Sequence, residues 1–449
     1  MRAEPQAAPY APDPQILAVA PWLGDAVPPA RFPQATLRFR NARWDKAVGL
    51  AGLPDADFTR HFSAFDPLPD NLPQPLALRY HGHQFRVYNP DLGDGRGFLY
   101  AQMRDGDGRL LDLGTKGSGR TPYSRTADGR LTLKGAVREI LATEMLEALG
   151  VYTSKTFAVI ETGEELVRGD EPSPTRSAVL TRLSHGHIRI GSFQRLAALG
   201  QNEHLALLVD YALQQYPGPP PPADAPDGDQ PAVRLMHLAV ERMADLAASY
   251  MVAGFVHGVL NTDNMNISGE SFDYGPWRWL PRWEPEFTAA YFDDHGLYAF
   301  GRQPGAIRWN LRQLAIALRP LVEAEGLIAA LDRFGPLYEA AMMRRFLWRL
   351  GRASQGPEAD AALVASAEVE MREQGIGPDL WFHRQRGMSG EPEAMLIDEV
   401  ETIWAAIAEQ DDWEPLHAKV ARLHALGRDL GEPPVPAGHL WPQQMESIS

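Results

Sequence analysis

The sequence predicts an α+β fold of two lobes, in which a β-rich lobe comes first and an α-rich lobe follows. Two strand-like segments separated by a tight turn occupy residues 98–115. From Leu133 the apolar residues recur at three- and four-residue spacing, which is the period of an amphipathic helix. After residue 183, helical patterns dominate to the C-terminus.

The length of the chain allows more than one packing unit. It has 449 residues, of which 44% are hydrophobic, so it can bury at least one large core. We expect an N-terminal extension (1–75), a β-rich lobe (76–185), an α-rich lobe (186–350) and a C-terminal helical region (351–449). The extension alternates short apolar stretches with prolines, so we expect it to wrap on a lobe rather than fold alone.

Charge and cysteine content exclude several classes of function. With 43 basic and 58 acidic residues the net charge is −15, which opposes binding to a phosphate backbone, so we expect no nucleic-acid partner. The chain has no cysteine, which excludes disulfides, thiolate nucleophiles and cysteine-ligated zinc. No apolar run approaches membrane-spanning length, so we expect a cytoplasmic protein without a membrane partner.

The β-rich lobe is predicted to contain a hairpin followed by a helix. Phe98–Met103 and Leu110–Thr115 are predicted as strands and Asp105–Gly108 as the turn between them. The helix is expected over residues 133–149, with Gly150 as its C-cap. Lys116 therefore lies at the exit of the hairpin.

Three further segments have a clear local pattern. Val151–Ile160 and Ala178–Leu183 are predicted as strands. Tyr216–Pro231 is rich in proline and aspartate, so we expect an exposed loop within the helical lobe. Glu399–Ile407 is an amphipathic stretch of the C-terminal helical region.

Two glycine-containing segments could bind phosphate. Leu92–Gly97 precedes a predicted strand, and its glycines would let backbone N–H groups approach an anion while Arg96 adds a charge. An ordinary hairpin turn is the alternative. Lys116–Arg125 combines three cations with glycines and hydroxyls, which suits a polyanionic ligand, although a solvated basic loop has the same composition.

The order of these elements is that of protein kinases. A Gly-rich turn, a hairpin, a strand-end lysine and a helical glutamate follow one another, and in kinases the lysine binds nucleotide phosphates and is held by the glutamate. Glu139 is the candidate partner of Lys116. It lies off the apolar stripe of its helix, so a solvated charge is the alternative.

The segment Phe255–Asn266, followed by Asp273, carries the densest set of oxygen ligands. Asp263, Asn264 and Asp273 could bind Mg²⁺ and supply a base for a hydroxyl nucleophile. This arrangement resembles the kinase catalytic loop and its Asp-Phe-Gly, with altered spacing and without His-Arg-Asp. An Asn/Asp-rich turn between a helix and a hairpin is the alternative.

Arginines and histidines gather near the predicted junction of the lobes. Arg182 and Arg189 flank His185 and His187, and each arginine could simply pair with a surface acid. We interpret the two histidines as structural rather than metal-binding, because no third soft ligand is near them. The same applies to the histidines of His81–His83.

Together these motifs resemble the selenoprotein O family, a group of pseudokinase-like protein adenylyltransferases. The resemblance covers about half of the chain and includes residues 80–85, 92–97, 116–125, 257–265, 273–276, 303–304 and 309–311. It implies a protein-kinase-like two-lobed fold. Relatives commonly end with a cysteine or selenocysteine, and this chain has neither, so thiol-based control is excluded here.

The resemblance also implies roles for individual residues. Asp263 would be the general base, Asn264 and Asp273 would hold Mg²⁺ or Mn²⁺, and Glu139 would orient Lys116. ATP would bind in an orientation flipped relative to kinases, so that the α-phosphate faces the acceptor. Its expected contacts are Gly93, Gly95, Arg96, Lys116, Asp128, Gly129, Arg182, Arg189 and Asp273.

The expected function is transfer of AMP from ATP to Ser, Thr or Tyr hydroxyls of proteins, including the chain itself. Three alternatives stay open. No residue pattern identifies the base, so UMP transfer from UTP fits equally. An ordinary protein kinase would transfer the γ-phosphate instead, and a nucleotide-binding pseudoenzyme would only present a surface to partners.

Overall fold

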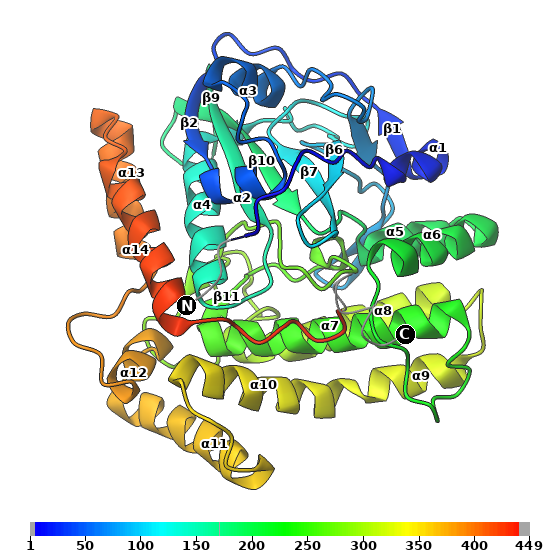
Figure 1. Ribbon diagram of the computed structural model, residues 1–449, viewed down its shortest axis with the longest axis vertical. Helices are drawn as coiled ribbons and strands as arrows, with labels where there is room; N and C mark the ends of the chain where they lie inside the picture. The colour runs from blue at the N-terminus through cyan, green and yellow to red at the C-terminus, as the bar shows by residue number, and fades with distance from the viewer. Residues whose placement is uncertain (1–4, 170, 440–449) are drawn as a thin grey trace.

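The structure is a computed structural model and describes residues 5–169 and 171–439 (Figure 1). Its first lobe is built on an eight-stranded sheet whose strand pairs are antiparallel. In spatial order the strands are β1 (Gly24–Ala26), β3 (Leu76–Leu78), β6 (Leu99–Arg104), β7 (Leu110–Lys116), β10 (Thr175–Ser184), β9 (Lys155–Leu166) and β2 (Thr36–Arg40), with β8 (Leu131–Thr132) paired to β10.

Helices cover both faces of this sheet. Val159 and Leu180 belong to the same buried cluster as Ile140 of α4 (Leu133–Ala148). On the other face, Phe62 of α3 (Asp55–Ser63) packs on Phe157 with ring centroids 5.3 Å apart. The central strands β6, β7, β9 and β10 are therefore covered on both sides, and most of their residues are buried, including polar ones such as Asp112 and Thr181.

Helix α4 has the ends that its sequence predicts. The side chain of Thr132 accepts a hydrogen bond from the backbone N–H of Gly135 at 3.1 Å, which caps the first turn. The helix ends at Ala148, and Gly150 follows in the left-handed region with φ +72°. The predicted helix, C-cap and hairpin are confirmed.

The strand predicted over Val151–Ile160 begins later, at Lys155. The reason is tertiary: Ser271 donates its backbone N–H to the oxygen of Tyr152, and Ser154 donates to the oxygen of Ser271, each at 2.9 Å. The residues before Lys155 therefore pair with the helical lobe instead of the sheet. The strand predicted over Ala178–Leu183 is confirmed within β10.

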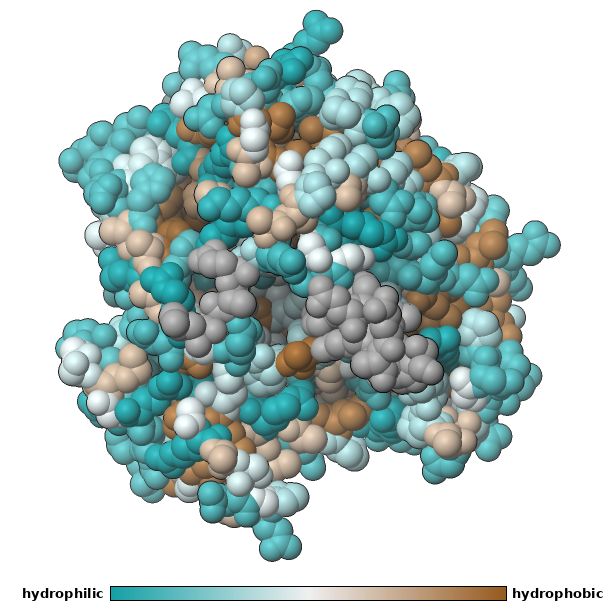
Figure 2. Space-filling model, viewed as in Figure 1, coloured by the Kyte–Doolittle hydropathy of each residue, from teal (hydrophilic) through white to brown (hydrophobic). Residues whose placement is uncertain are grey.

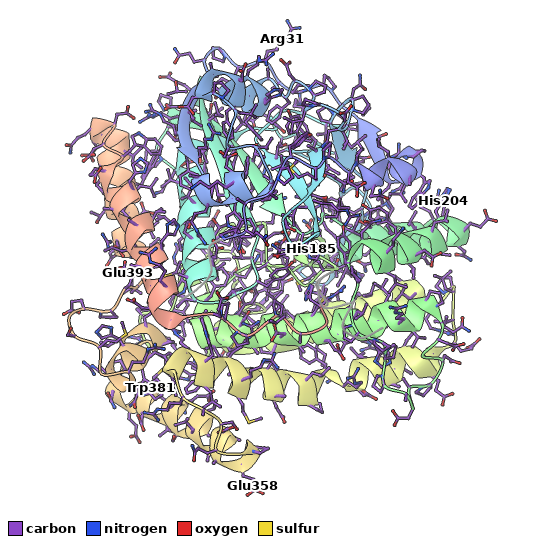
Figure 3. All side chains as sticks on the ribbon, viewed as in Figure 1. Arg31, His185, His204, Glu358, Trp381 and Glu393 are labelled. Carbon is purple, nitrogen blue, oxygen red and sulfur yellow. The ribbon has the colours of Figure 1, made fainter. Side chains whose placement is uncertain are left out.

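The N-terminal extension is part of the sheet lobe. Its strands β1 and β2 form the two ends of the sheet order, and it also supplies η1 (Gln15–Ala18), α1 (Ala20–Leu23) and α2 (Ala42–Ala47). Trp22 stacks on His204 of α6 (Asn202–Gln215) at a centroid distance of 4.8 Å, and Figure 3 labels His204 on that helix. The extension thus connects the two lobes.

The second lobe is mainly helical. Its elements are α5 (Ile190–Ala198), α6 (Asn202–Gln215), α7 (Pro231–Ala253), β11 (Phe255–Val256), η2 (Thr262–Asn264), β12 (Arg278–Trp279), η3 (Phe300–Arg302), α8 (Gln303–Leu318), α9 (Ala324–Asp332) and α10 (Phe334–Leu350). Helix α7 is almost entirely buried and contacts α6, α8, α9 and α10. The predicted loop over Tyr216–Pro231 connects α6 to the first residue of α7, but Tyr216 at its start is fully buried and not exposed.

Within residues 351–439, the C-terminal region contains four more helices. They are α11 (Pro357–Gln374), α12 (Pro378–Gln385), α13 (Ile397–Gln410) and α14 (Glu414–Leu430). Figure 1 shows α13 and α14 beside the sheet lobe, where α14 packs on α4. His424 and Glu144 form a 2.7 Å contact across this interface, so the chain returns from the helical lobe to the first lobe.

The exterior is predominantly polar on the face drawn in Figure 2, where hydrophobic residues occupy small patches between hydrophilic ones. Among the described helices, none combines the length and the apolar character that crossing a membrane requires.

Candidate active site

A cleft of about 310 Å³ lies between the two lobes, and its lining comes from segments that are far apart in the sequence. The first lobe contributes the Gly-rich loop and the end of β7, and the second contributes Arg189, Asp263 and Asp273. Most of the predicted site residues line it: Gly93, Gly95, Arg96, Lys116, Arg182, Arg189, Asp263 and Asp273.

The Gly-rich loop is tightly packed, which explains its glycines. A Cβ atom on Gly93 would lie 2.3 Å from the ring of Tyr123, and one on Gly97 would lie 2.0 Å from the oxygen of Thr115. Tyr123 is held in place because its hydroxyl donates to Asp25 of β1. A side chain at either glycine would therefore displace the loop or its neighbours.

Lys116, at the end of β7, forms a buried ion pair. Its Nζ lies 2.6 Å from Glu139 Oε2 and 3.2 Å from Asp273 Oδ1. Glu139, on α4, is only 1% exposed, so its alternative interpretation as a solvated charge is wrong. The pair fixes the lysine on the cleft wall, where a phosphate oxygen could approach it.

Asp273 is an anion in a cationic environment. Burial raises the pKa of its carboxyl, but Lys116, Arg182 and two further arginines outweigh burial and hold that pKa well below the usual range. Its backbone is left-handed, with φ +64°, which a non-glycine residue rarely adopts outside constrained sites. Asp273 is therefore ionised and rigidly presented to the cleft.

Two arginines form the buried part of the cleft wall. Arg182 and Arg189 are 5% and 3% exposed. The guanidinium carbon of Arg189 lies 4.4 Å from the ring centroid of Tyr80, and its Nη1 is 3.0 Å from Asp94 Oδ1. Arg189 Nε has no hydrogen-bond acceptor among the described residues, whereas Nη1 is already paired with the Asp94 carboxylate. A buried donor such as this Nε suits an anionic ligand.

Arg182 is positioned by the segment that joins the lobes. Its Nε lies 3.3 Å from His187 Nε2, and His187 Nδ1 lies 3.2 Å from Asp112 Oδ2. His185 also lies between the sheet and the helices (Figure 3). No group of three or more His, Cys, Asp or Glu side chains that could hold a metal ion occurs in residues 5–169 and 171–439.

Asp263 lies in the short helix η2, which the β4–β5 hairpin supports. The hairpin comprises β4 (Gly82–Gln84) and β5 (Val87–Asn89), and the backbone N–H of His83 donates to Thr262 Oγ1 at 2.7 Å. Burial, together with the nearby charge of Asp273, raises the pKa of Asp263 to about 6. A carboxylate with this pKa can accept a proton near neutral pH.

Four predicted residues lie outside the lining of the cleft: Glu139, which lies behind Lys116, and Asn264, Asp128 and Gly129. Asn264 donates from Nδ2 to the oxygen of Val259 at 2.9 Å. Asp128 pairs with Arg168 at 2.8 Å on the surface, and Gly129 packs on Gly119. Asn264, Asp128 and Gly129 are not among the residues that line the cleft, although Asn264 is next in the chain to Asp263, so their predicted roles stay predictions.

Other lining residues had no role in the sequence interpretation. Tyr123, Ser124 and Arg125 line the cleft, and the only sequence feature that pointed to them is that they belong to the basic segment Lys116–Arg125. Tyr80 and Gln84 also line it. Nothing local distinguishes Gln84, because only the docking of the β4–β5 hairpin on η2 brings it to Asp263.

These contacts define a protein-kinase-like arrangement. A Gly-rich loop, a strand-end lysine held by a helical glutamate, and an aspartate of the second lobe that contacts the lysine all meet at one cleft. Among solved structures, a Toxoplasma gondii specific rhoptry antigen kinase domain matches with a TM-score of 0.28 and 12% identity, covering 66% of this chain and 87% of that domain. This similarity is too low to add to the argument from the contacts.

Known sequences identify the family. The sequence model described as "Protein adenylyltransferase SelO" matches residues 12–391. A protein nucleotidyltransferase YdiU of Synechocystis sp. is 40% identical, covering 89% of this chain and 95% of the relative. Those of Gloeobacter violaceus and Synechococcus elongatus are 42% and 47% identical, covering 89% and 83% of this chain and 92% and 75% of the relatives. The chain therefore belongs to the SelO family and is an enzyme of the nucleotidyltransferase class.

Proposed function

We propose that this enzyme transfers AMP from ATP to the hydroxyl groups of Ser, Thr or Tyr side chains in proteins, including its own. The observation that supports this most directly is the distribution of cations in the cleft. Arg182 and Arg189 are buried, whereas Arg96 and Arg125 are exposed. The most highly charged part of a nucleotide, its β- and γ-phosphates, pairs best with the buried arginines and with Lys116.

This pairing favours one orientation of the nucleotide. With the β- and γ-phosphates in the buried part of the cleft, the α-phosphate is the one nearest to the opening, where an acceptor can reach it. A kinase needs the opposite orientation, because its acceptor attacks the γ-phosphate. The buried arginines therefore favour nucleotidyl transfer with ATP flipped relative to kinases.

The proposed chemistry uses one proton acceptor and several cations. Asp263 accepts the proton of the acceptor hydroxyl, whose oxygen attacks the α-phosphorus. A bond forms between these two atoms, and the bond from the α-phosphorus to the bridging oxygen breaks. Pyrophosphate leaves, and Lys116, Arg182 and Arg189 stabilise its charge. Positioning and charge stabilisation supply most of the catalysis in this class of reaction.

The donor set fits Mg²⁺ or Mn²⁺. The low pKa of Asp273 supplies an ionised carboxylate. Asn264 is fixed through its Nδ2, which leaves its carboxamide oxygen as a second hard donor. Because described side chains alone make no complete site, phosphate oxygens would complete the coordination, as is usual for Mg²⁺. When bound, the ion would neutralise phosphate charge.

The decisive test uses ATP labelled at a chosen phosphate. Protein incubated with metal and ATP labelled at the α-phosphate should become labelled, and γ-labelled ATP should not label it. Intact mass measurement should show the gain of one AMP, and Asp263→Ala should abolish that gain while retaining nucleotide binding. Because Asp263 is assigned to proton transfer rather than to phosphate binding, loss of binding in this variant would contradict its role.

The same experiment separates the alternatives. Label from γ-labelled ATP would identify an ordinary protein kinase. Nucleotide and metal binding without any label, equal in the wild type and in Asp263→Ala, would identify a pseudoenzyme scaffold. A preference for UTP labelled at the α-phosphate over ATP would identify UMP transfer.

A further inference from the structure

The tip of the β4–β5 hairpin is strained. Gln84 pairs with Val87, so a two-residue turn of Phe85 and Arg86 connects the strands. Both turn residues have left-handed backbones, with φ +48° and +65°. Such turns favour Asn and Gly, because a larger side chain strains the left-handed backbone. Strain of this kind persists where surrounding contacts and function both fix the backbone.

Contacts with the catalytic segment hold the strained turn. The backbone N–H of Phe85 donates to Asn261 Oδ1 at 3.0 Å, and the ring of Phe85 lies 5.1 Å from that of Tyr298. Tyr298 in turn donates its hydroxyl to the same Asn261 oxygen at 2.6 Å. The hairpin, the residues before Asp263 and the segment after Asp273 therefore form one connected unit beside the proposed base.

This unit presents an unusual set of exposed side chains. Across residues 5–169 and 171–439, only three aromatic side chains are found among the exposed large hydrophobics, and they are Tyr88, Tyr291 and Phe292. Tyr88 belongs to β5 of the hairpin, and Tyr291 packs on Phe292, which packs on Phe85, at centroid distances of 5.1 and 5.9 Å. Scattered exposed apolar residues need no explanation, but an aromatic cluster beside a catalytic group does.

Arg86 adds a positive charge to this surface. Its guanidinium carbon lies 5.6 Å from the ring centroid of Trp309, and no described carboxylate pairs with it. The nearby carboxylate of Asp293 accepts backbone hydrogen bonds from Leu297 and Tyr298, both at 2.8 Å. Arg86 is thus an exposed cation available to an outside carboxylate.

We propose that this unit is the docking surface for the acceptor protein. We call it the acceptor rim, and it consists of Phe85, Arg86, Val87, Tyr88, Tyr291 and Phe292. Its aromatic part fits a large apolar side chain of an extended acceptor segment, and Arg86 fits a carboxylate beside it. The acceptor class is therefore a peptide with an apolar and an acidic residue flanking the modified hydroxyl. This inference rests on the proposed function.

Two substitutions test the rim without touching the cleft. Tyr291→Ala removes a ring that is 81% exposed, so little packing is lost. Arg86→Gly removes the charge and relieves the left-handed strain, so the fold should be retained. Val167→Ala is the matched control, because Val167 is 80% exposed and lies just beyond β9, outside the rim.

The experiment uses two fluorescent peptides with one tyrosine each, flanked by phenylalanine and glutamate in one and by glycine and lysine in the other. Peptide binding is measured by anisotropy with ATP and metal present, and AMP transfer is measured separately from α-labelled ATP. The wild type and Val167→Ala should bind the acidic, apolar peptide about tenfold more tightly. Arg86→Gly and Tyr291→Ala should lose most of this preference while binding ATP normally.

Each outcome decides a separate question. Equal binding of the two peptides by the wild type, or an unchanged preference in both rim variants, would overturn the rim. A preference that the rim variants lose, without AMP transfer by the wild type, would support the rim and contradict the proposed function. AMP transfer by the wild type, with an unchanged peptide preference in the rim variants, would support the proposed function and contradict the rim.

Discussion

Replacing Asp263 by asparagine should make the protein more stable while it abolishes AMP transfer. The carboxyl is buried, its Oδ1 has no hydrogen-bond donor among the described residues, and its pKa is raised from 3.8 to about 6. A shift of about 2 pKa units corresponds to about 3 kcal/mol that the ionised form costs the folded state at neutral pH. Asparagine has nearly the same shape and no charge, so the variant avoids this cost.

The sign of the pH dependence follows from the direction of the shift. Because the folded state holds the proton more tightly than the unfolded state, wild-type stability falls as pH rises from 3.8 through about 6. The advantage of Asp263→Asn should therefore be largest above pH 7 and about half as large at pH 5. Its dependence on pH distinguishes a charge effect from a packing effect.

Thermal unfolding without nucleotide and metal measures this difference. An unfolding entropy of about 2.1 cal/mol/K per residue over 449 residues converts 3 kcal/mol into a Tm increase of about 3 °C at pH 7.5. Asp210→Asn, an exposed carboxylate of α6, is the control and should leave the Tm unchanged. A Tm for Asp263→Asn that is unchanged, lower, or raised equally at pH 5 and 7.5 would refute the reasoning.

Three further predictions concern the cleft. Glu139→Gln should lower the Tm by about 3–5 °C, because breaking a buried ion pair costs about 3–5 kcal/mol. The exposed Glu203→Gln should leave the Tm unchanged, and equal thermal scans for the two variants would contradict the role of the pair. Gly97→Ala should weaken ATP binding, because its Cβ would lie 2.0 Å from Thr115 O. Gly52→Ala is the control and should bind ATP normally, because its Cβ meets no atom within 4 Å. Calorimetric titration with ATP compares the two variants. AMP transfer should fall as pH drops through about 6, when Asp263 becomes protonated; an initial-rate profile that stays flat to pH 5 would exclude it as the base.

In the first lobe, sequence patterns predicted the helices and strands that are determined by residues close together in the chain. The hairpin before Lys116 and the helix that carries Glu139 follow from alternation, helical spacing and a glycine C-cap, and the structure confirms them. The late start of β9 was not predictable, because Ser271 of the other lobe captures the backbone beside Tyr152. The contacts of α14 with α4 are equally non-local.

The sequence by itself determined the chemical groups that are present: which side chains carry charge, where the glycines lie, and that no thiol takes part. These properties belong to single residues and short motifs. Only the tertiary structure decided that Glu139 is buried against Lys116, that Asp128 faces Arg168 instead of the cleft, and that the β4–β5 hairpin supports Asp263. Those outcomes depend on which distant surfaces bury each other, and no local pattern encodes that choice.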